Sequence, residues 1–228
     1  MRVVAATGNS HKITELRSLF GSFGVEVVSK REAGVTAPDP EETGVTFEEN
    51  AIAKAQAVFA CCGEATVADD SGLEVDALGG DPGIYSARFF EMSARGMPGG
   101  IFGAESDDEV NDEMPALFKQ DGGVDAANNR LLLRCLKDVP PESRTARFVC
   151  AIAFIESGKE PLAIRGVCEG RIADRPSGTE GFGYDPLFIP DEYASEGLTF
   201  AQLTEADKNR ISHRGRALAL LAEKLRAR

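Results

Sequence analysis

The chain has 228 residues, 43% of them hydrophobic, which is enough for one domain with a substantial core, built as one lobe or as two. Its net charge of −12 argues against a nucleic-acid partner, although a small polyanion can bind where a divalent metal and a few local cations offset its charge. The sequence shows no membrane-spanning run, no secretory signal and no CxxC spacing among its five cysteines, so we expect a cytoplasmic protein with reduced thiols and no membrane partner.

The first element predicted is a short strand over residues 2–6, and a helix follows over about residues 13–20. Between them lies the turn Thr7-Gly8-Asn9-Ser10-His11-Lys12. A strand that breaks into such a turn presents free backbone N–H groups at the helix N-terminus, and together with Lys12 these can hold a phosphate. The turn matches neither the P-loop pattern nor the dinucleotide-binding fingerprint. The alternative is an ordinary turn in which Asn9 or Ser10 caps the helix.

The pattern continues with a strand over residues 25–29, an acidic loop over 32–44 and a helix over 46–62, where Thr46 and Glu49 have capping-box spacing. A short strand over 65–68 then ends at Asp69-Asp70-Ser71-Gly72, and the pattern of residues 73–75 fits a further strand. A carboxylate at the end of a sheet strand can bind Mg²⁺ or accept a proton from water. The alternative is a turn in which Asp70 caps local N–H groups.

Further acids and bases could complete such a site. A second metal carboxylate could come from the acidic loop or from the start of the helix that follows it, where the candidates are Glu41, Glu42, Glu48 and Glu49. The alternative is a solvated loop followed by acids that the helix dipole favours. Lys54 and Arg88 are candidates for phosphate contacts.

Residues 91–123 are acidic and show no clear period, which indicates a solvated insertion or, as the alternative, a partner-binding or lid element. A helix is predicted over 125–136, an antiparallel strand pair over 146–155 and 162–170, a short strand over 186–189, and helices over 204–209 and 212–226. Because strands and helices alternate, the fold class is α/β with a mixed sheet.

Two further segments suggest a binding role. Residues 177–186 form a Gly-rich loop with Phe182 and Tyr184, and aromatic side chains in such a loop can stack on a base. The alternative is a Gly-rich hairpin with Phe182 in the core. Lys208 and Ser212-His213-Arg214 stand at a helix start, where donors could read a 6-oxo group. Here the alternative is that Ser212 is an N-cap and His213 a surface residue.

These motifs, in this order, resemble the family of inosine triphosphate pyrophosphatases, also described as noncanonical purine nucleoside triphosphate pyrophosphatases. The matching segments extend over nearly the whole chain: residues 7–12, 42–44, 46–51, 54–55, 68–73, 78–80, 82–88, 181–186, 208–209 and 212–214. The resemblance implies an elongated mixed β-sheet flanked by helices, with two lobes around a central nucleotide cleft, usually as a homodimer. It also implies Mg²⁺-dependent hydrolysis of ITP, dITP and XTP to the monophosphate and pyrophosphate.

The resemblance also implies roles for individual residues. Asp70 is the expected proton acceptor and a metal ligand, and Glu41 is the expected second metal ligand, with Glu42 and Glu49 as alternatives. The residues expected to bind substrate are Thr7, Gly8, Asn9, Ser10, His11, Lys12, Ser71, Phe182, Gly183, Tyr184, Asp185, Lys208, His213 and Arg214, with Lys54 and Arg88 as lesser candidates.

Two departures from the family pattern are present, and two other functions remain open. His11 stands where Gly is common, and the acidic insertion at residues 91–123 is longer than the usual link, which puts the homodimer surface in question. The competing functions are a nucleotide sensor that has lost turnover and a pyrophosphatase for modified pyrimidine nucleoside triphosphates. The retained Asp70 and Lys12 argue against the sensor.

Overall fold

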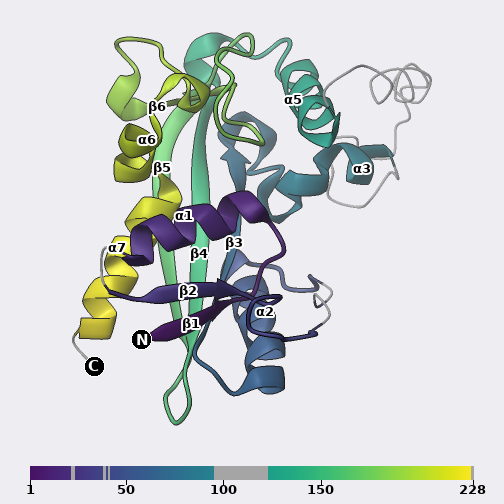
Figure 1. Ribbon diagram of the computed structural model, residues 1–228. Helices are drawn as coiled ribbons and strands as arrows, with labels where there is room; N and C mark the ends of the chain where they lie inside the picture. Colours follow the sequence, from purple (N-terminus) through teal and green to yellow (C-terminus); the bar gives the residue numbers. More distant parts are fainter. Residues whose placement is uncertain (22–23, 38–39, 41, 95–122, 227–228) are drawn as a thin grey trace. The chain divides into compact units, whose positions relative to one another are not determined.

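The computed structural model describes residues 1–21, 24–37, 40, 42–94 and 123–226. These residues contain a six-stranded mixed sheet in the order β2-β1-β3-β4-β5-β6, flanked by helices, which confirms the predicted α/β class (Figure 1). The strands are β1 Arg2–Ala5, β2 Glu26–Ser29, β3 Thr66–Val75, β4 Thr145–Ile155, β5 Leu162–Ile172 and β6 Phe188–Pro190. The described helices are α1 Ser10–Gly21, α2 Phe47–Cys62, α3 Phe89–Ala94, α5 Gly123–Cys135, α6 Glu205–Ile211 and α7 His213–Arg226. Shorter 3₁₀ segments lie at Asp76–Leu78, Gly83–Arg88, Pro141–Ser143, Asp191–Tyr193 and Phe200–Gln202.

Strand β1 lies between β2 and β3 and runs parallel to both, so that Val4 pairs with Val28 on one side and with Thr66 on the other. Parallel neighbours require a crossover connection, and α1 and α2 lie in the connections between these strands. The carboxyl ends of β1, β2 and β3 therefore point toward the same edge of the sheet. Strands β5 and β6 are antiparallel, with Arg171 opposite Ile189.

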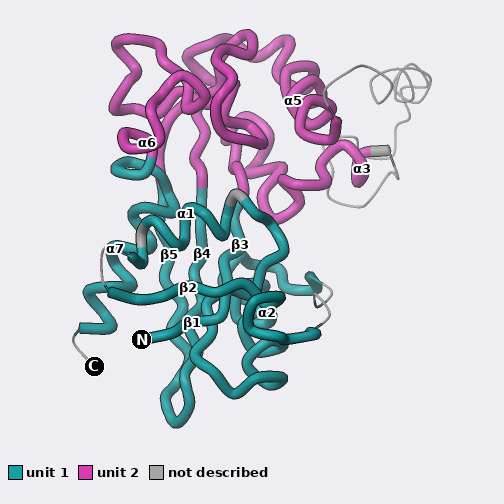
Figure 2. The backbone as a smooth tube through the Cα atoms, viewed as in Figure 1, with its two compact units in different colours: residues 1–71, 149–167, 209–228 teal, residues 72–148, 168–208 magenta. Residues whose placement is uncertain are grey.

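The chain forms two compact units (Figure 2). Unit 1 comprises residues 1–71, 149–167 and 209–228, and unit 2 comprises residues 72–148 and 168–208. The boundaries fall inside β3, β4 and β5, so each of these strands contributes residues to both units. Unit 1 holds β1, β2, α1, α2 and α7, whereas unit 2 holds α3, α5 and β6.

In unit 1, helices cover the sheet on both sides (Figure 1). Val67 of β3 belongs to a buried core that also contains Leu16 of α1 and Leu221 of α7. The buried residues of α2 are Phe47, Asn50, Ala51, Ala55 and Val58. Successive side chains of a strand point to opposite faces. Asp69 therefore lies on the same face as Val67, toward α1 and α7, while Asp70 lies on the face that α2 covers.

The core of unit 2 contains an aromatic cluster and a buried amide. The ring centroid of Phe148 lies 4.7 Å from that of Phe188 and 5.8 Å from that of Phe200. The Asn128 side chain accepts a hydrogen bond from the Phe90 N–H at 2.9 Å and donates to the Ser86 carbonyl at 3.3 Å. Helix α5 is thereby fixed to the Gly83–Arg88 segment and to the start of α3.

Strand β3 corrects one sequence prediction. The strand was predicted to end before Asp69, with a turn as the alternative environment of Asp70, but a single strand of 10 residues runs from Thr66 to Val75. Asp, Ser and Gly favour turns when their side chains bond locally. Here the Asp69 and Asp70 side chains bind groups that are distant in the sequence, so the extended backbone continues through them.

Three further expectations concern the acidic insertion, the cysteines and membrane-spanning helices. Of the predicted acidic insertion at residues 91–123, the start is helical in α3 and Gly123 begins α5, while residues 95–122 lie outside the described residues. All five cysteines are free thiols; Cys150 and Cys168 are buried, whereas Cys61 is exposed. Among the described helices, none has the length and apolar character that a membrane span needs.

Candidate functional site

The predicted phosphate turn is a capped helix start in unit 1. Asn9 precedes α1, and its Oδ1 accepts a hydrogen bond from the Lys12 N–H at 3.2 Å, which confirms Asn9 as the capping residue. The Asn9 N–H in turn donates to Thr7 Oγ1 at 3.2 Å. A Cβ added at Gly8 would meet no atom within 4 Å, so the turn borders open space. A helix N-terminus beside open space is a suitable place for an anion.

The turn lies next to the two aspartates of β3. The Ala6 N–H donates to the Val67 carbonyl at 2.8 Å, so the pairing of β1 with β3 continues to the residue before Thr7. Ala68, Asp69 and Asp70 are the next residues of β3 after Val67. The phosphate turn therefore begins where β1 ends, beside the stretch of β3 that carries the acid pair. Ligands of α/β proteins commonly bind at the carboxyl ends of parallel strands.

Asp69 is buried, with 2% of its surface exposed, and it is held by two cations. Its Oδ2 lies 3.0 Å from Lys12 Nζ and 2.9 Å from Arg214 Nη2. Burial raises the pKa of Asp69, but Lys12 and Arg214 outweigh it, so the pKa lies well below the usual range. Arg214 is also buried and contacts Ser71 Oγ at 3.2 Å and the Glu15 carboxylate. This network connects α1, β3 and α7.

Asp70 has different partners on the opposite face. Its Oδ1 lies 2.7 Å from Lys54 Nζ, and its Oδ2 accepts a hydrogen bond from Asn50 Nδ2 at 3.3 Å. Burial raises the pKa of Asp70 above its usual value, and this effect is only partly offset by Lys54. For Lys54, burial alone would lower the pKa, but Asp70 and Glu42 raise it on balance. A carboxylate with a raised pKa is a better proton acceptor than an ordinary aspartate.

A second carboxylate meets Asp70 at Lys54. Glu42 Oε1 lies 2.5 Å from Lys54 Nζ, so two carboxylates converge on one ammonium group. Two carboxylates that converge in this way fit Mg²⁺, which usually takes one or two of them together with substrate phosphates. Glu49 instead accepts a hydrogen bond from the Val45 N–H at 2.8 Å. Among the described residues no group of three or more potential metal-binding side chains is found. Glu41 and the His11 side chain lie outside the described part of the chain.

Unit 2 contains the predicted aromatic loop. Asp185 is buried, and its Oδ2 accepts hydrogen bonds from the Phe182 N–H and from Lys208 Nζ, both at 2.8 Å. Lys208 Nζ also lies 5.2 Å from the centre of the half-buried Phe182 ring, which is therefore not a core residue. Gly181 has φ +78, and a Cβ there would lie 2.0 Å from Asp185 Oδ2, so both the backbone angle and the space require glycine.

Helix α5 supports the same loop. The Gly183 N–H donates to Asp125 at 2.8 Å, and its carbonyl accepts a hydrogen bond from Asn129 Nδ2 at 2.8 Å. Tyr184 is buried and donates to the Ser86 carbonyl at 2.9 Å, and burial raises the pKa of its hydroxyl. The sequence reasoning gave no role to Asp125 or Asn129. The signal that could have pointed to Asn129 is the adjacent pair Asn128 and Asn129 within a predicted helix, because asparagine is a poor helix former.

The remaining predicted residues are also located. Ser212 caps α7 as predicted, since its Oγ accepts a hydrogen bond from the Gly215 N–H at 3.1 Å. His213 is buried at 6% exposure, so its interpretation as a surface residue was wrong. A Cβ at Gly166 would lie 2.2 Å from the His213 carbonyl, which shows how closely α7 approaches β5. Arg88 is half-buried, with its guanidinium 5.9 Å from the Tyr85 ring centre.

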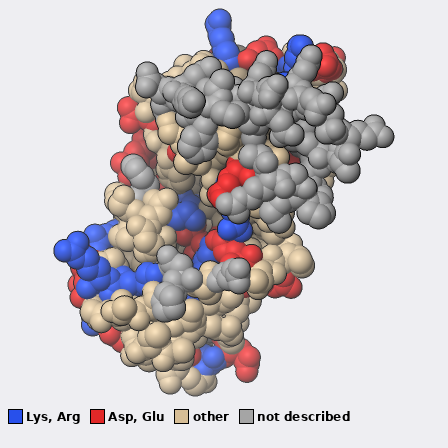
Figure 3. All heavy atoms as spheres, turned by 90° about the vertical axis from the view of Figure 1, so that its right-hand side faces the viewer, with Lys and Arg blue, Asp and Glu red and all other residues tan. Residues whose placement is uncertain are grey.

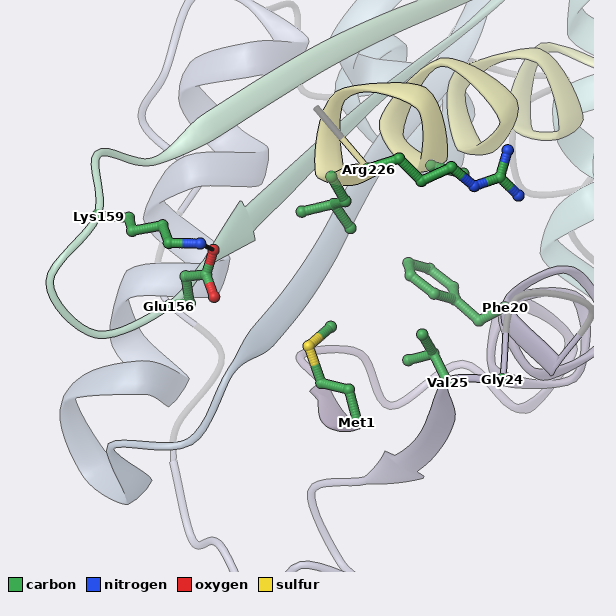
Figure 4. A pocket seen from close by; sticks show the side chains of 9 residues that line it. Met1, Phe20, Gly24, Val25, Glu156, Lys159 and Arg226 are labelled. Atoms are coloured by element: carbon green, nitrogen blue, oxygen red, sulfur yellow. Dashed lines mark ion pairs between the residues drawn. The ribbon is translucent and has the colours of Figure 1, made fainter. Parts of the chain in front are cut away.

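The candidate residues thus form two groups, one in each unit. Unit 1 holds the phosphate turn together with Lys54, Asp70, Ser71, His213 and Arg214, and unit 2 holds Arg88, Phe182–Asp185 and Lys208. Figure 3 shows basic and acidic side chains lying next to one another on one face of the molecule. The fold and the first group define an α/β protein with a charged site beside the carboxyl end of β1, on the neighbouring parallel strands β1 and β3.

Comparison with known proteins identifies the family. The sequence profile of the Ham1 family matches residues 3–105 and 113–224. A dITP/XTP pyrophosphatase of Exiguobacterium sibiricum is 44% identical over 221 residues, which cover 97% of this chain and 95% of the relative. The dITP/XTP pyrophosphatase of Escherichia coli K12 is 41% identical, with coverage of 99% and 98%. The chain therefore belongs to the Ham1 family.

Solved structures agree with this assignment. A HAM1 protein from Coxiella burnetii has a TM-score of 0.75 to this chain and 34% identity, and each chain is covered completely. A nucleoside-triphosphatase and dITP/XTP pyrophosphatase from Mycobacterium abscessus has a TM-score of 0.66 and 39% identity, with coverage of 97% and 98%. The expected family resemblance and the mixed-sheet fold are confirmed.

Proposed function

We propose that this protein hydrolyses dITP, XTP and ITP to the nucleoside monophosphate and pyrophosphate. The names of its relatives support the substrate class. The observation that carries the proposal is the position of Asp70. This buried carboxylate has a raised pKa and lies on β3 three residues after Val67, whose carbonyl accepts a hydrogen bond from the Ala6 N–H just before the phosphate turn. Such a turn can hold phosphates while the carboxylate acts on a water molecule.

In the proposed reaction, Asp70 orients a water molecule and accepts its proton as the oxygen attacks the α-phosphorus. The anhydride bond to the β-phosphate breaks, and pyrophosphate leaves. Lys12 and the first turn of α1 stabilise the negative charge of the phosphates. Lys54 keeps the carboxylates of Asp70 and Glu42 close to each other.

We further propose that the enzyme requires Mg²⁺. The converging carboxylates of Asp70 and Glu42 support this, and Glu41 remains a candidate ligand outside the described residues. When bound, the ion would neutralise charge on the phosphates and so favour departure of pyrophosphate. Removal of divalent ions with EDTA should abolish turnover, and added Mg²⁺ should restore it.

For the base, we propose that unit 2 supplies the contacts. Phe182 offers a half-buried ring for stacking, and Lys208 offers a donor that is held in place by Asp185. Donors that meet a 6-oxo group would face the amino group of adenine, and such a mismatch can discriminate strongly. The Arg214 guanidinium contacts Asp69, Ser71 and Glu15. These contacts favour a role for Arg214 in positioning the Asp69 and Ser71 side chains, in addition to its predicted contact with the base.

The proposal is tested by measuring pyrophosphate release from ITP, XTP, dUTP, GTP and ATP with Mg²⁺. We expect ITP and XTP to be hydrolysed faster than the other nucleotides. Binding of ITP without release would instead support the nucleotide sensor, and preference for dUTP would support the pyrimidine alternative. The homodimer stays a prediction, and analytical ultracentrifugation would test it.

A further inference from the structure

A groove of about 600 Å³ opens in unit 1 beside the phosphate turn. Thr7 and Gly8 form one wall, and Lys30, Arg31 and the loop at residues 34–37 form much of the rest. The described residues that line the groove include two cations and no carboxylate. Although the chain has a net charge of −12, the described lining of this groove is positively charged, which favours an anionic ligand.

The strand register explains why these residues meet. Ala5 of β1 pairs with Ser29 of β2 in a parallel ladder, and both strands end at that level. The residues that follow Ala5 form the phosphate turn, and those that follow Ser29 are Lys30 and Arg31. The two cations therefore emerge at the same edge as Thr7 and Gly8, although more than twenty positions separate them in the sequence.

The second wall is held by its own hydrogen bonds. The Val35 N–H donates to the Lys30 carbonyl at 2.8 Å, and Lys30 Nζ donates to the Ala37 carbonyl at 3.4 Å. Glu32 accepts a hydrogen bond from the Ser29 N–H at 2.7 Å and pairs with Arg17. Glu32 is the one carboxylate in residues 29–37. Because Ser29 and Arg17 engage it, it does not neutralise the positive charge of the groove.

Arg31 is the most accessible cation of the groove. Its side chain is exposed, and among the described residues its guanidinium has no ion-pair partner. A guanidinium presents several donors in a fixed plane and can bind a phosphate through two of them. Lys30 adds a second, more compact positive charge. A ligand with at least two adjacent phosphate groups suits this pair.

We infer that this groove binds the distal phosphates of the substrate and, after cleavage, the released pyrophosphate. The inference rests on the proposed function, because it extends the phosphate turn toward the part of the triphosphate that leaves. Lys30 and Arg31 then contribute to the recognition of a triphosphate over a monophosphate, whereas the base contacts of unit 2 are independent of them.

The test compares two variants that each lose two positive charges. Lys30→Ala/Arg31→Ala alters the groove, and Lys159→Ala/Lys224→Ala removes two exposed lysines elsewhere in unit 1 as a matched control. The inhibition constant of pyrophosphate against ITP hydrolysis should rise roughly tenfold or more in the groove variant, the scale expected when hydrogen bonds to a charged group are lost. The control should match the wild type, and the inhibition constant of IMP should not change in either.

Unchanged inhibition by pyrophosphate in the groove variant would overturn the inference, as would equal weakening of pyrophosphate and IMP. Lys30→Arg/Arg31→Lys should keep pyrophosphate binding near the wild-type value, since both charges remain. Calorimetry with pyrophosphate and Mg²⁺ measures the same difference without turnover. If the wild type releases no pyrophosphate from ITP, the proposed function fails, while the calorimetry still decides whether the groove binds pyrophosphate.

Discussion

Arg214 and Asp69 form a buried ion pair across a sequence separation of 145 residues, with 2.9 Å between Nη2 and Oδ2. Their exposed fractions are 3% and 2%. Lys12 completes the network on the other side of the carboxylate. The start of the phosphate-turn helix and the start of the last helix are thus connected through one side chain of β3.

Replacement of Arg214 by methionine should destabilise the protein strongly. Removal of one partner from a buried pair leaves an uncompensated charge and typically costs about 3–5 kcal/mol of unfolding free energy. Urea denaturation would measure the loss. Lys224→Met, an exposed change on the same helix, should stay within about 0.5 kcal/mol of the wild type. If Arg214→Met costs no more than this control, the pair does not hold the helices together.

The contribution of Asp69 to stability should depend on pH. Its pKa is lowered in the folded state, while the pKa in the unfolded chain is about 3.9. The stabilisation is therefore fully present above the unfolded value and is lost as the pH falls through the folded value. Asp69→Asn should cost the same unfolding free energy at pH 7 and pH 5 and less below about pH 4. A cost that grows on acidification, measured by urea denaturation across this range, would contradict the assignment.

Asp70→Asn should abolish most turnover and preserve binding. Loss of a general base typically lowers the rate by about a hundred- to ten-thousandfold. The amide is close in size to the carboxylate, so ITP binding measured by calorimetry should persist. Asp174→Asn changes an acid whose side chain is 70% exposed and serves as the control, which should keep the wild-type rate. Turnover by Asp70→Asn near the wild-type rate would exclude Asp70 as the proton acceptor.

Asp185→Asn should weaken nucleotide binding rather than the chemical step. The carboxylate holds both Lys208 Nζ and the Phe182 N–H, and an amide can accept but loses the charge that attracts the ammonium. We expect KM for ITP to rise by about tenfold with a much smaller change in kcat, since the proposed contacts are made to the base. A fall in kcat at unchanged KM would show that the loop acts on the reacting phosphate instead.

The cysteines should differ in their reaction with iodoacetamide at neutral pH. Cys61 is exposed, whereas burial raises the pKa of Cys135 to about 11 and that of Cys150 to about 12. Because the thiolate is the reactive form, Cys135 and Cys150 should remain unmodified while Cys61 is alkylated, as peptide mass spectrometry can show. Alkylation of Cys150 as rapidly as Cys61 would contradict its buried environment.

Local signals in the sequence predicted much of the fold. The spacing of Thr46 and Glu49 predicted the start of α2, and the Glu49 N–H donates to Thr46 Oγ1 at 3.2 Å. The Glu49 side chain accepts from the Val45 N–H, one residue before the partner that a capping box would have. The described helices other than α3, and most of the strands, followed in the same way from periodicity and caps, whereas α3 was not predicted.

The partners within the site could not be predicted in this way. Asn50 and Glu15 contact Asp70 and Arg214, but nothing in their local pattern distinguishes them from ordinary helix residues. Strand β3 was divided in the prediction because its polar residues resemble a turn, and only long-range ion pairs explain why it continues. Contacts of this kind depend on how distant segments meet, which one sequence does not display.

The alternation along β3 has a consequence for changes in chain length. Asp69 and Asp70 are chemically identical, and only the count of residues from the paired Val67 decides which one meets α2 and which one meets α1 and α7. Deletion or insertion of one residue just before them would exchange their surroundings and turn neighbouring apolar side chains to the wrong faces. This segment should therefore tolerate conservative substitutions far better than any single-residue indel.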